Sequence, residues 1–143
     1  MRADTQTEAA VKSMLNKFSE TYTKRDLDGL VALFVPDSDV VVIGTGADEK
    51  RVGIDEVIVQ AKRDWGQSDA ASIEFEWSLV SAAGPVAWVA TEASVRLKAG
   101  EQEMSLPARL TAVLERRGDK WLFAQAHLSF PAAGQVEGES FPT

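Results

Sequence analysis

The sequence predicts an α+β domain in which helices cover one face of a long, curved, mainly antiparallel sheet. Helical patterns fill the first half of the chain, and alternating strand patterns fill the second half. With 143 residues, 45% of them hydrophobic, the chain can bury the core of one domain. We expect this domain to span residues 1–131 and the Gly- and Pro-containing segment 132–143 to be an irregular tail. A sheet that curves around helices leaves an internal cavity where a small ligand binds.

Three helices are predicted before the long strands. Thr5-x-x-Glu8 has the form of a capping box that begins the first helix. The apolar residues that follow have the spacing of one helical face: Val11, Met14, Leu15, Phe18 and Tyr22. The second helix covers residues 26–34, and the third covers residues 54–65. Between them, VVVI at 40–43 predicts a short buried strand and GTGADEKRVG at 44–53 predicts a loop.

The second half of the chain predicts an antiparallel meander. Apolar and polar residues alternate over 73–79, which is typical of a strand. The turn sequences AAGP, KAGE and RGDK then separate three further strands, at about 86–98, 102–116 and 120–130. Connections this short join neighbouring antiparallel strands.

Composition excludes several classes of function. A net charge of −7 argues against nucleic acid and anionic membrane surfaces, which require clustered Lys and Arg. The chain has no cysteine and one histidine, so we expect no disulfide, no thiol nucleophile, no metal site and no cofactor. The polar N-terminus and the absence of any run of 18 apolar residues predict a cytoplasmic protein that does not enter a membrane.

Three segments carry a resemblance to known families. RDLDGLVALFVPDSDVVV resembles the second helix and first strand of the ketosteroid isomerase group, in the nuclear transport factor 2-like superfamily. ERRGDKWLFAQAHLSF resembles the last hairpin of the association domain of calcium/calmodulin-dependent kinase II. Over residues 8–131 the chain resembles SnoaL-like proteins. The resemblance implies a cystatin-like cone, with three N-terminal helices on a curved sheet around a cavity. It does not fix the activity, because this fold hosts isomerases, dehydratases, hydrolases and assembly domains.

Carried over residue by residue, the resemblance argues against two activities of the related families, the isomerase mechanism and carboxylate binding by an arginine cluster. The positions of the isomerase's general base and of its oxyanion donor fall on Val42 and Phe18, neither of which transfers a proton. The arginine cluster of the association domain falls on Glu92, Ala112 and Leu128. An apolar wall with one acid predicts that the cavity takes a largely hydrophobic or a cationic small molecule. The expected lining comprises Met14, Phe18, Tyr22, Val42, Val57, Trp65, Trp88, Ala112 and Leu128.

Alternation in the last strand predicts which side chains face the cavity. Residues 122, 124, 126, 128 and 130 form a wholly apolar set, which we expect to face the helices. The other set begins with Trp121 and Phe123 and should form the outer face. In this fold the outer face commonly packs on a second subunit, so we expect a homodimer. The expected interface residues are Arg109, Thr111, Gln125, His127 and Ser129.

His127 and Glu92 are the candidate catalytic residues, and each has a structural alternative. His127 is an interface residue on the outer face, unless a bulge near Pro131 turns it inward as a general base. Hydrophobicity alone places Glu92 in solvent, whereas the association-domain alignment places it in the cavity, where a carboxylate can act as acid or base. Glu92 can instead form an ion pair with Arg96 or Arg109. The sequence therefore leaves two hypotheses open, a small-molecule protein with acid–base chemistry or a non-catalytic assembly module.

Overall fold

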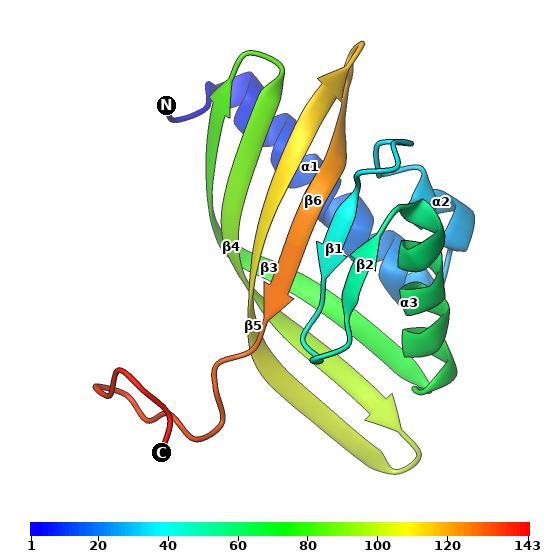
Figure 1. Ribbon diagram of the computed structural model, residues 1–143, viewed down its shortest axis with the longest axis vertical. Helices are drawn as coiled ribbons and strands as arrows, with labels where there is room; N and C mark the ends of the chain where they lie inside the picture. Colours follow the sequence, from blue (N-terminus) through cyan, green and yellow to red (C-terminus); the bar gives the residue numbers. More distant parts are fainter.

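The computed structural model describes all 143 residues and has the predicted α+β architecture. Three helices pack on one face of a six-stranded sheet that curves around them (Figure 1). The helices are α1 (Thr5–Lys24), α2 (Leu27–Val31) and α3 (Ile54–Gly66). Beyond Ser129 the chain forms no further helix or strand, and the tail projects away from the body of the molecule (Figure 1).

The sheet has the strand order β2-β1-β6-β5-β4-β3. Its strands are β1 (Val41–Ile43), β2 (Lys50–Val52), β3 (Ala70–Ala83), β4 (Val86–Ala99), β5 (Gln102–Arg117) and β6 (Lys120–Ser129). All neighbours are antiparallel except β1 and β6, which pair in parallel. Strand β2 lies within the segment that the sequence predicts to be a loop. Its three residues carry no alternating hydrophobic pattern, and their extended conformation depends on pairing with β1.

Two helix details differ from the sequence prediction. Helix α1 begins one residue earlier than a capping box at Thr5 implies, because Asp4 is the N-cap and its carboxylate accepts from the Thr7 N–H at 2.7 Å. Helix α2 is also shorter than predicted. After it, Phe34 forms a parallel bridge with Phe123, and Val35 donates its N–H to the Phe123 carbonyl at 2.9 Å. Phe34 and Val35 therefore pack beside β6 and do not continue the helix.

A β-bulge in β6 changes which of its side chains face the core. Val113 pairs with Gln125 but Leu114 pairs with Phe123, so Ala124 is an extra residue. Trp121 and Phe123 are consequently buried, with 7% and 3% of their surface exposed. The prediction that these two residues face outward is wrong, because strict alternation does not survive the bulge. Beyond the bulge, Ala126, Leu128 and Phe130 line the cavity, as the pattern predicts, and Gln125 and His127 are exposed.

A second bulge, in β3, brings large apolar side chains onto the outer face. Phe75 pairs with Ala93 and Ser78 pairs with Thr91, which leaves one extra residue on β3. The Thr91 hydroxyl donates to the Trp77 carbonyl at 2.8 Å at this point. Trp77 is therefore 55% exposed, although the alternating pattern places it with the inward-facing Phe75.

The hydrophobic core fills the space between the helices and one half of the sheet. Val11 of α1, Val35 and Leu114 of β5 are fully buried there. At the other half of the sheet, helices and strands diverge around the cavity described below. None of the helices has both the length and the apolar content needed to cross a bilayer.

Candidate functional site

A cavity of about 410 Å³ lies between the helices and the sheet. This volume lies within the range of pockets that bind small organic molecules. Its wall is mainly apolar and comes from all three helices and from β1, β3, β4, β5 and β6. Representative apolar lining residues are Phe18, Val42, Val57, Val95, Leu110 and Leu128.

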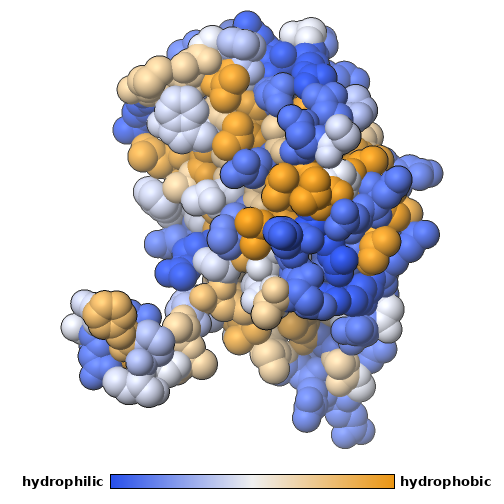
Figure 2. Space-filling model, in the orientation of Figure 1, coloured by the Kyte–Doolittle hydropathy of each residue, from blue (hydrophilic) through white to orange (hydrophobic).

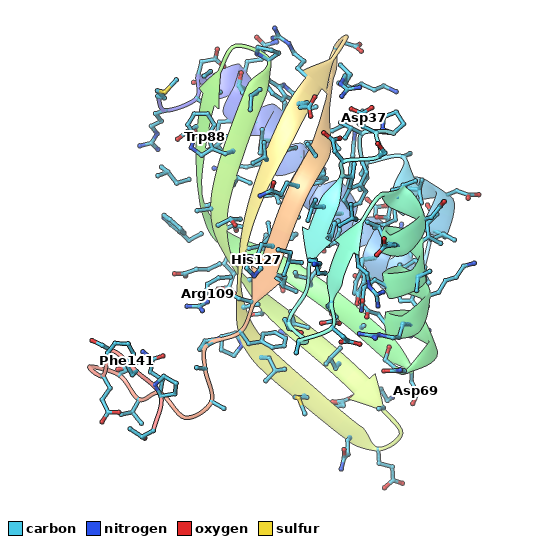
Figure 3. The ribbon with its side chains drawn as sticks, viewed as in Figure 1. Asp37, Asp69, Trp88, Arg109, His127 and Phe141 are labelled. Carbon is cyan, nitrogen blue, oxygen red and sulfur yellow. The ribbon has the colours of Figure 1, made fainter.

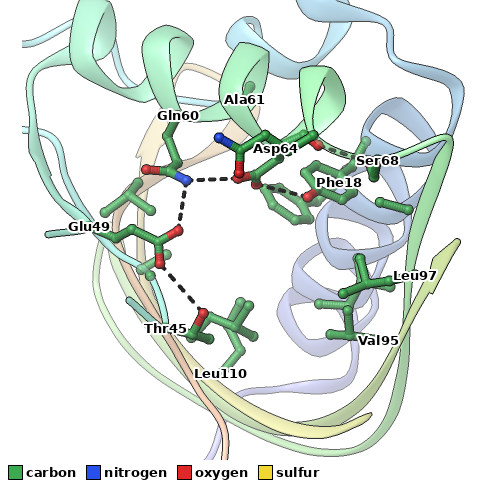
Figure 4. Close-up of a pocket in the computed structure, with 18 of the residues that line it drawn as sticks. Phe18, Thr45, Glu49, Gln60, Ala61, Asp64, Ser68, Val95, Leu97 and Leu110 are labelled. Atoms are coloured by element: carbon green, nitrogen blue, oxygen red, sulfur yellow. Dashed lines mark hydrogen bonds between the residues drawn. The ribbon is translucent and has the colours of Figure 1, made fainter. Parts of the chain in front are cut away.

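Polar side chains line one wall of this cavity as a connected chain. Tyr22 Oη donates to Asp64 Oδ2 at 2.8 Å, and Gln60 Nε2 donates to Asp64 Oδ1 at 2.7 Å. The same Gln60 nitrogen donates to Glu49 Oε1 at 2.8 Å. Figure 4 shows Glu49, Gln60 and Asp64 on one side of the cavity, with Val95 and Leu97 on the opposite side. The cavity therefore has one polar wall and one apolar wall.

The fold fixes these side chains from two helices. Gln60 and Asp64 are four residues apart on α3, so they lie on one face of the helix. Tyr22 lies in the last turns of α1. Two hydrogen bonds connect the C-terminal ends of α1 and α3. The Trp65 indole donates to the Tyr22 carbonyl at 3.1 Å, and the Arg25 guanidinium donates to the Trp65 carbonyl at 2.6 Å.

Electrostatics keep the tyrosine neutral. Burial, together with the adjacent Asp64 carboxylate, raises the pKa of Tyr22 far above its ordinary value, because both disfavour a phenolate. The phenol proton therefore stays between Tyr22 and Asp64 at neutral pH. Tyr22 holds the carboxylate in place and does not present its own proton to the cavity.

The two carboxylates in this hydrogen-bonded series, Glu49 and Asp64, have different roles. Glu49 accepts from Gln60, Arg63 (3.3 Å), Thr45 (3.4 Å) and the Gly46 N–H, so it uses its acceptor capacity to close the loop after β1. Asp64 accepts only from Tyr22 and Gln60 among side chains. A carboxylate offers about four acceptor positions, so Asp64 retains about two. Asp64 is therefore the carboxylate on this wall with free capacity to accept a hydrogen bond or a proton from a ligand.

Comparison with protein families identifies the domain. Residues 11–133 match the model of the SnoaL-like domain. The chain belongs to the SnoaL-like domain family. The resemblance inferred from the sequence segments is therefore confirmed. Comparison with curated proteins finds no sequence match.

Solved structures similar to this SnoaL-like domain show the same fold. A candidate dehydratase of the nuclear transport factor 2-like family from Streptomyces avermitilis has a TM-score of 0.80 and 18% identity, over 87% of this chain and 97% of that one. A protein of unknown function with a cystatin-like fold from Nostoc punctiforme has a TM-score of 0.77 and 13% identity, over 93% and 97%. A candidate calcium/calmodulin-dependent kinase II association domain from Xanthomonas campestris has a TM-score of 0.75 and 18% identity, over 86% of both chains. The fold of this SnoaL-like domain is cystatin-like.

Five of the nine predicted pocket residues line the cavity of this SnoaL-like domain: Phe18, Tyr22, Val42, Val57 and Leu128. The other four do not. Met14 lies one turn before Phe18 on α1 and is buried in the core, as is Ala112, two residues beyond Leu110 on β5. Trp65 packs against Tyr22, with ring centroids 6.0 Å apart, and Trp88 is 39% exposed on the outer face.

Both predicted catalytic residues lie outside the cavity. Glu92 is exposed on the outer face, opposite Arg109 in the β4–β5 register, so the alignment that placed it inside is wrong and the hydrophobic pattern is right. His127 is exposed on the same face, opposite Thr111 (Figure 3). The Arg109 Nε donates to Ser129 Oγ at 3.3 Å, and Gln125 is exposed nearby on β6. The predicted interface residues therefore share one face, away from the cavity.

Sequence reasoning missed Glu49, Gln60 and Asp64. A signal for two of them exists, because Gln60 and Asp64 each follow a buried residue of α3, Val57 and Ala61, by three positions. A polar side chain at that spacing lies beside the apolar stripe of the helix. No comparable pattern marks Glu49, whose position depends on the pairing of β1 with β2.

Proposed function

We propose that this SnoaL-like protein binds a small, largely apolar molecule in its cavity and acts on it by acid–base chemistry at Asp64. The observation that carries the proposal is a carboxylate with spare acceptor capacity on the wall of an otherwise apolar cavity of about 410 Å³. A mainly apolar cavity with a few convergent polar groups is typical of small-molecule sites. The name of one structural neighbour, a candidate dehydratase, supports this class of chemistry.

Each polar residue has a defined role in this proposal. Asp64 accepts a proton from the bound molecule. Tyr22 and Gln60 are positioning residues, because each donates to one carboxylate oxygen and so fixes the plane of the group. Arg51 fixes Gln60 in turn, by donating to its Oε1 at 2.9 Å. The apolar wall packs against the rest of the ligand and orients it.

The isomerase mechanism is not part of this proposal. Val42 and Phe18, which occupy the positions of the isomerase's base and oxyanion donor, line the cavity as apolar side chains. Proton transfer in this cavity therefore depends on the polar wall, where α3 carries Asp64.

Native mass spectrometry of freshly purified protein tests the proposal, followed by denaturing extraction of any retained molecule. We expect a retained apolar compound that, when added back, is converted by the wild type and by the control Asp55→Asn but not by Asp64→Asn. Asp55 is exposed on the same helix and does not line the cavity. Protein that is always empty, and that gains no thermal stability from any of a panel of apolar compounds, would contradict the proposal.

We further propose that the outer sheet face pairs two copies of the chain. The face carries exposed apolar side chains from β3 and β4, namely Trp77 (55% exposed), Leu79 (42%) and Trp88 (39%). Arg109 and His127 lie on the same face, and Figure 2 shows apolar atoms interspersed with polar ones there. Exposed tryptophans among polar side chains are typical of protein interfaces. The name of the Xanthomonas campestris neighbour, a candidate association domain, supports a role in self-association.

A further inference from the structure

The polar wall of the cavity has almost no free hydrogen-bond donor. The phenol proton of Tyr22 goes to Asp64, and both amide protons of Gln60 go to carboxylates. The Thr45 hydroxyl donates to Glu49 at 3.4 Å, and the Ser68 hydroxyl donates to the Asp64 carbonyl at 2.8 Å. Every side-chain donor on this wall therefore already has an acceptor within the protein.

Acceptors remain free on the same wall. Asp64 keeps about two of its four acceptor positions, and the Tyr22 oxygen keeps its lone pairs. A ligand group that only accepts hydrogen bonds, such as a carboxylate or a ketone, finds no donor here. It would lose its hydration without compensation, which is costly in an apolar cavity. A ligand group that donates a hydrogen bond finds a free acceptor on this wall.

The charges favour a cation over a neutral donor. Three ionisable side chains other than Tyr22 line the cavity, Glu49, Asp64 and Lys98. Lys98 is exposed, on β4 beside the hairpin turn, and Glu49 is paired with Arg63 at 3.3 Å. Asp64 accepts from the neutral donors Tyr22 and Gln60 only, so its negative charge has no cationic partner on this wall. The chain as a whole carries a net charge of −7, which raises the local concentration of cations around it. A charge-assisted hydrogen bond to a carboxylate is also about twice as strong as a neutral one.

We propose that the ligand is a protonated amine with an apolar body, whose ammonium group donates to Asp64 while the body packs against the apolar wall. This inference rests on the proposed function of the cavity and names the chemical class of its ligand. Of the two acceptor positions that Asp64 retains, the ammonium uses one and leaves the other for proton transfer. The free donors at the exposed rim, Gln67, Lys98 and Gln102, contact the part of the ligand that points to solvent.

Three compounds that share one apolar cage test this inference: 1-adamantylamine, 1-adamantanol and adamantane-1-carboxylate. Their affinities are measured at neutral pH by isothermal titration calorimetry on the full chain. We expect the amine to bind at least about tenfold more tightly than the alcohol, and the carboxylate to show no measurable binding. In Asp64→Asn the amine should fall to the affinity of the alcohol, whereas the control Asp55→Asn should keep the wild-type order. Retained alcohol binding shows that the cavity of Asp64→Asn is intact.

The outcomes separate this inference from the proposed function. Equal affinity of amine and alcohol, preference for the carboxylate, or a preference for the amine that survives in Asp64→Asn overturns the inference and leaves the binding cavity in place. Failure of all three compounds to bind the wild type overturns the proposed function together with the inference. If the Asp64→Asn chain does not fold, the order of affinities in the wild type alone still tests whether the cavity prefers a protonated amine.

Discussion

Removing the contact between Tyr22 and Asp64 should cost free energy of unfolding in a way that a double-mutant cycle can isolate. The Tyr22 hydroxyl donates to an ionised acceptor at 2.8 Å in a partly buried site. Hydrogen bonds to charged groups contribute about 1.5–3 kcal/mol. Because solvent reaches the cavity, we take the lower end and expect Tyr22→Phe to cost about 1.5 kcal/mol. Asp64→Asn should cost a similar amount, since it also weakens the bond from Gln60 at 2.7 Å.

The cycle compares Tyr22→Phe, Asp64→Asn and the double variant with the wild type. Urea unfolding followed by tryptophan fluorescence suits this protein, because Trp65 contacts Tyr22 and reports on the site. The double variant should lose less than the sum of the single variants, with a coupling energy of about 1–2 kcal/mol. Additive losses, with a coupling below about 0.3 kcal/mol, would show that the pair is not a stabilising contact and would refute the assigned role of Tyr22.

Four further predictions follow from the fold and its surfaces. Tyr22 is the only tyrosine, and its pKa in the folded chain lies above the ordinary value of about 10, so stability falls as the pH rises above about 10; alkaline ultraviolet titration should show phenolate only as circular dichroism reports unfolding. Arg109→Glu combined with His127→Asp should weaken self-association in analytical ultracentrifugation, and an unchanged dimer would place the interface elsewhere. Leu114→Ala, at a fully buried side chain, should cost about 2–5 kcal/mol in urea unfolding. Asp4→Ala removes the N-cap of α1 and should cost about 0.5–2 kcal/mol by the same measurement.

Regular elements of this fold were predictable because their signals are local. Apolar spacing predicted α1 and α3, and glycine-containing turns placed the three long hairpins. At these turns Gly84, Gly100 and Gly118 adopt φ values of 58°, 63° and 66°, a region that other residues rarely enter. A turn that needs glycine can be read from sequence, since the requirement lies in the residue itself.

The bulges in β3 and β6 were not predictable in the same way. A bulge depends on how a strand pairs with its neighbour, and neither Trp77 nor Ala124 carries a local sign of it. Each bulge inverts the alternation for the rest of its strand. Burial of Trp121 and exposure of Trp77 both follow from one extra residue in the strand that carries them. Errors about which face a side chain occupies therefore appear in blocks bounded by a bulge, before it in β6 and after it in β3.

The two catalytic candidates lie outside the cavity for a related reason. Both lie on strands, whereas Asp64, the carboxylate proposed to accept a proton, comes from α3. The resemblance to relatives of this fold indicates functional groups on the strands, whereas Asp64 lies beside the apolar stripe of α3. The pairing of Tyr22 with Asp64, 42 residues apart, depends on the packing of α1 against α3. Such a pairing becomes visible only when the tertiary structure is known.

The bulge in β6 also explains how one strand serves both the core and the cavity. Before Ala124, β6 directs Trp121 and Phe123 into the core beneath α1 and α2, where large rings fill the space. After Ala124, the smaller side chain of Ala126 faces the helices, followed by Leu128 at the cavity wall. A strand without the bulge would direct Gln125 and His127 toward the cavity and bring polar groups into its apolar wall. The extra residue therefore keeps that wall apolar, and the polar wall with Asp64 lies across the cavity on α3.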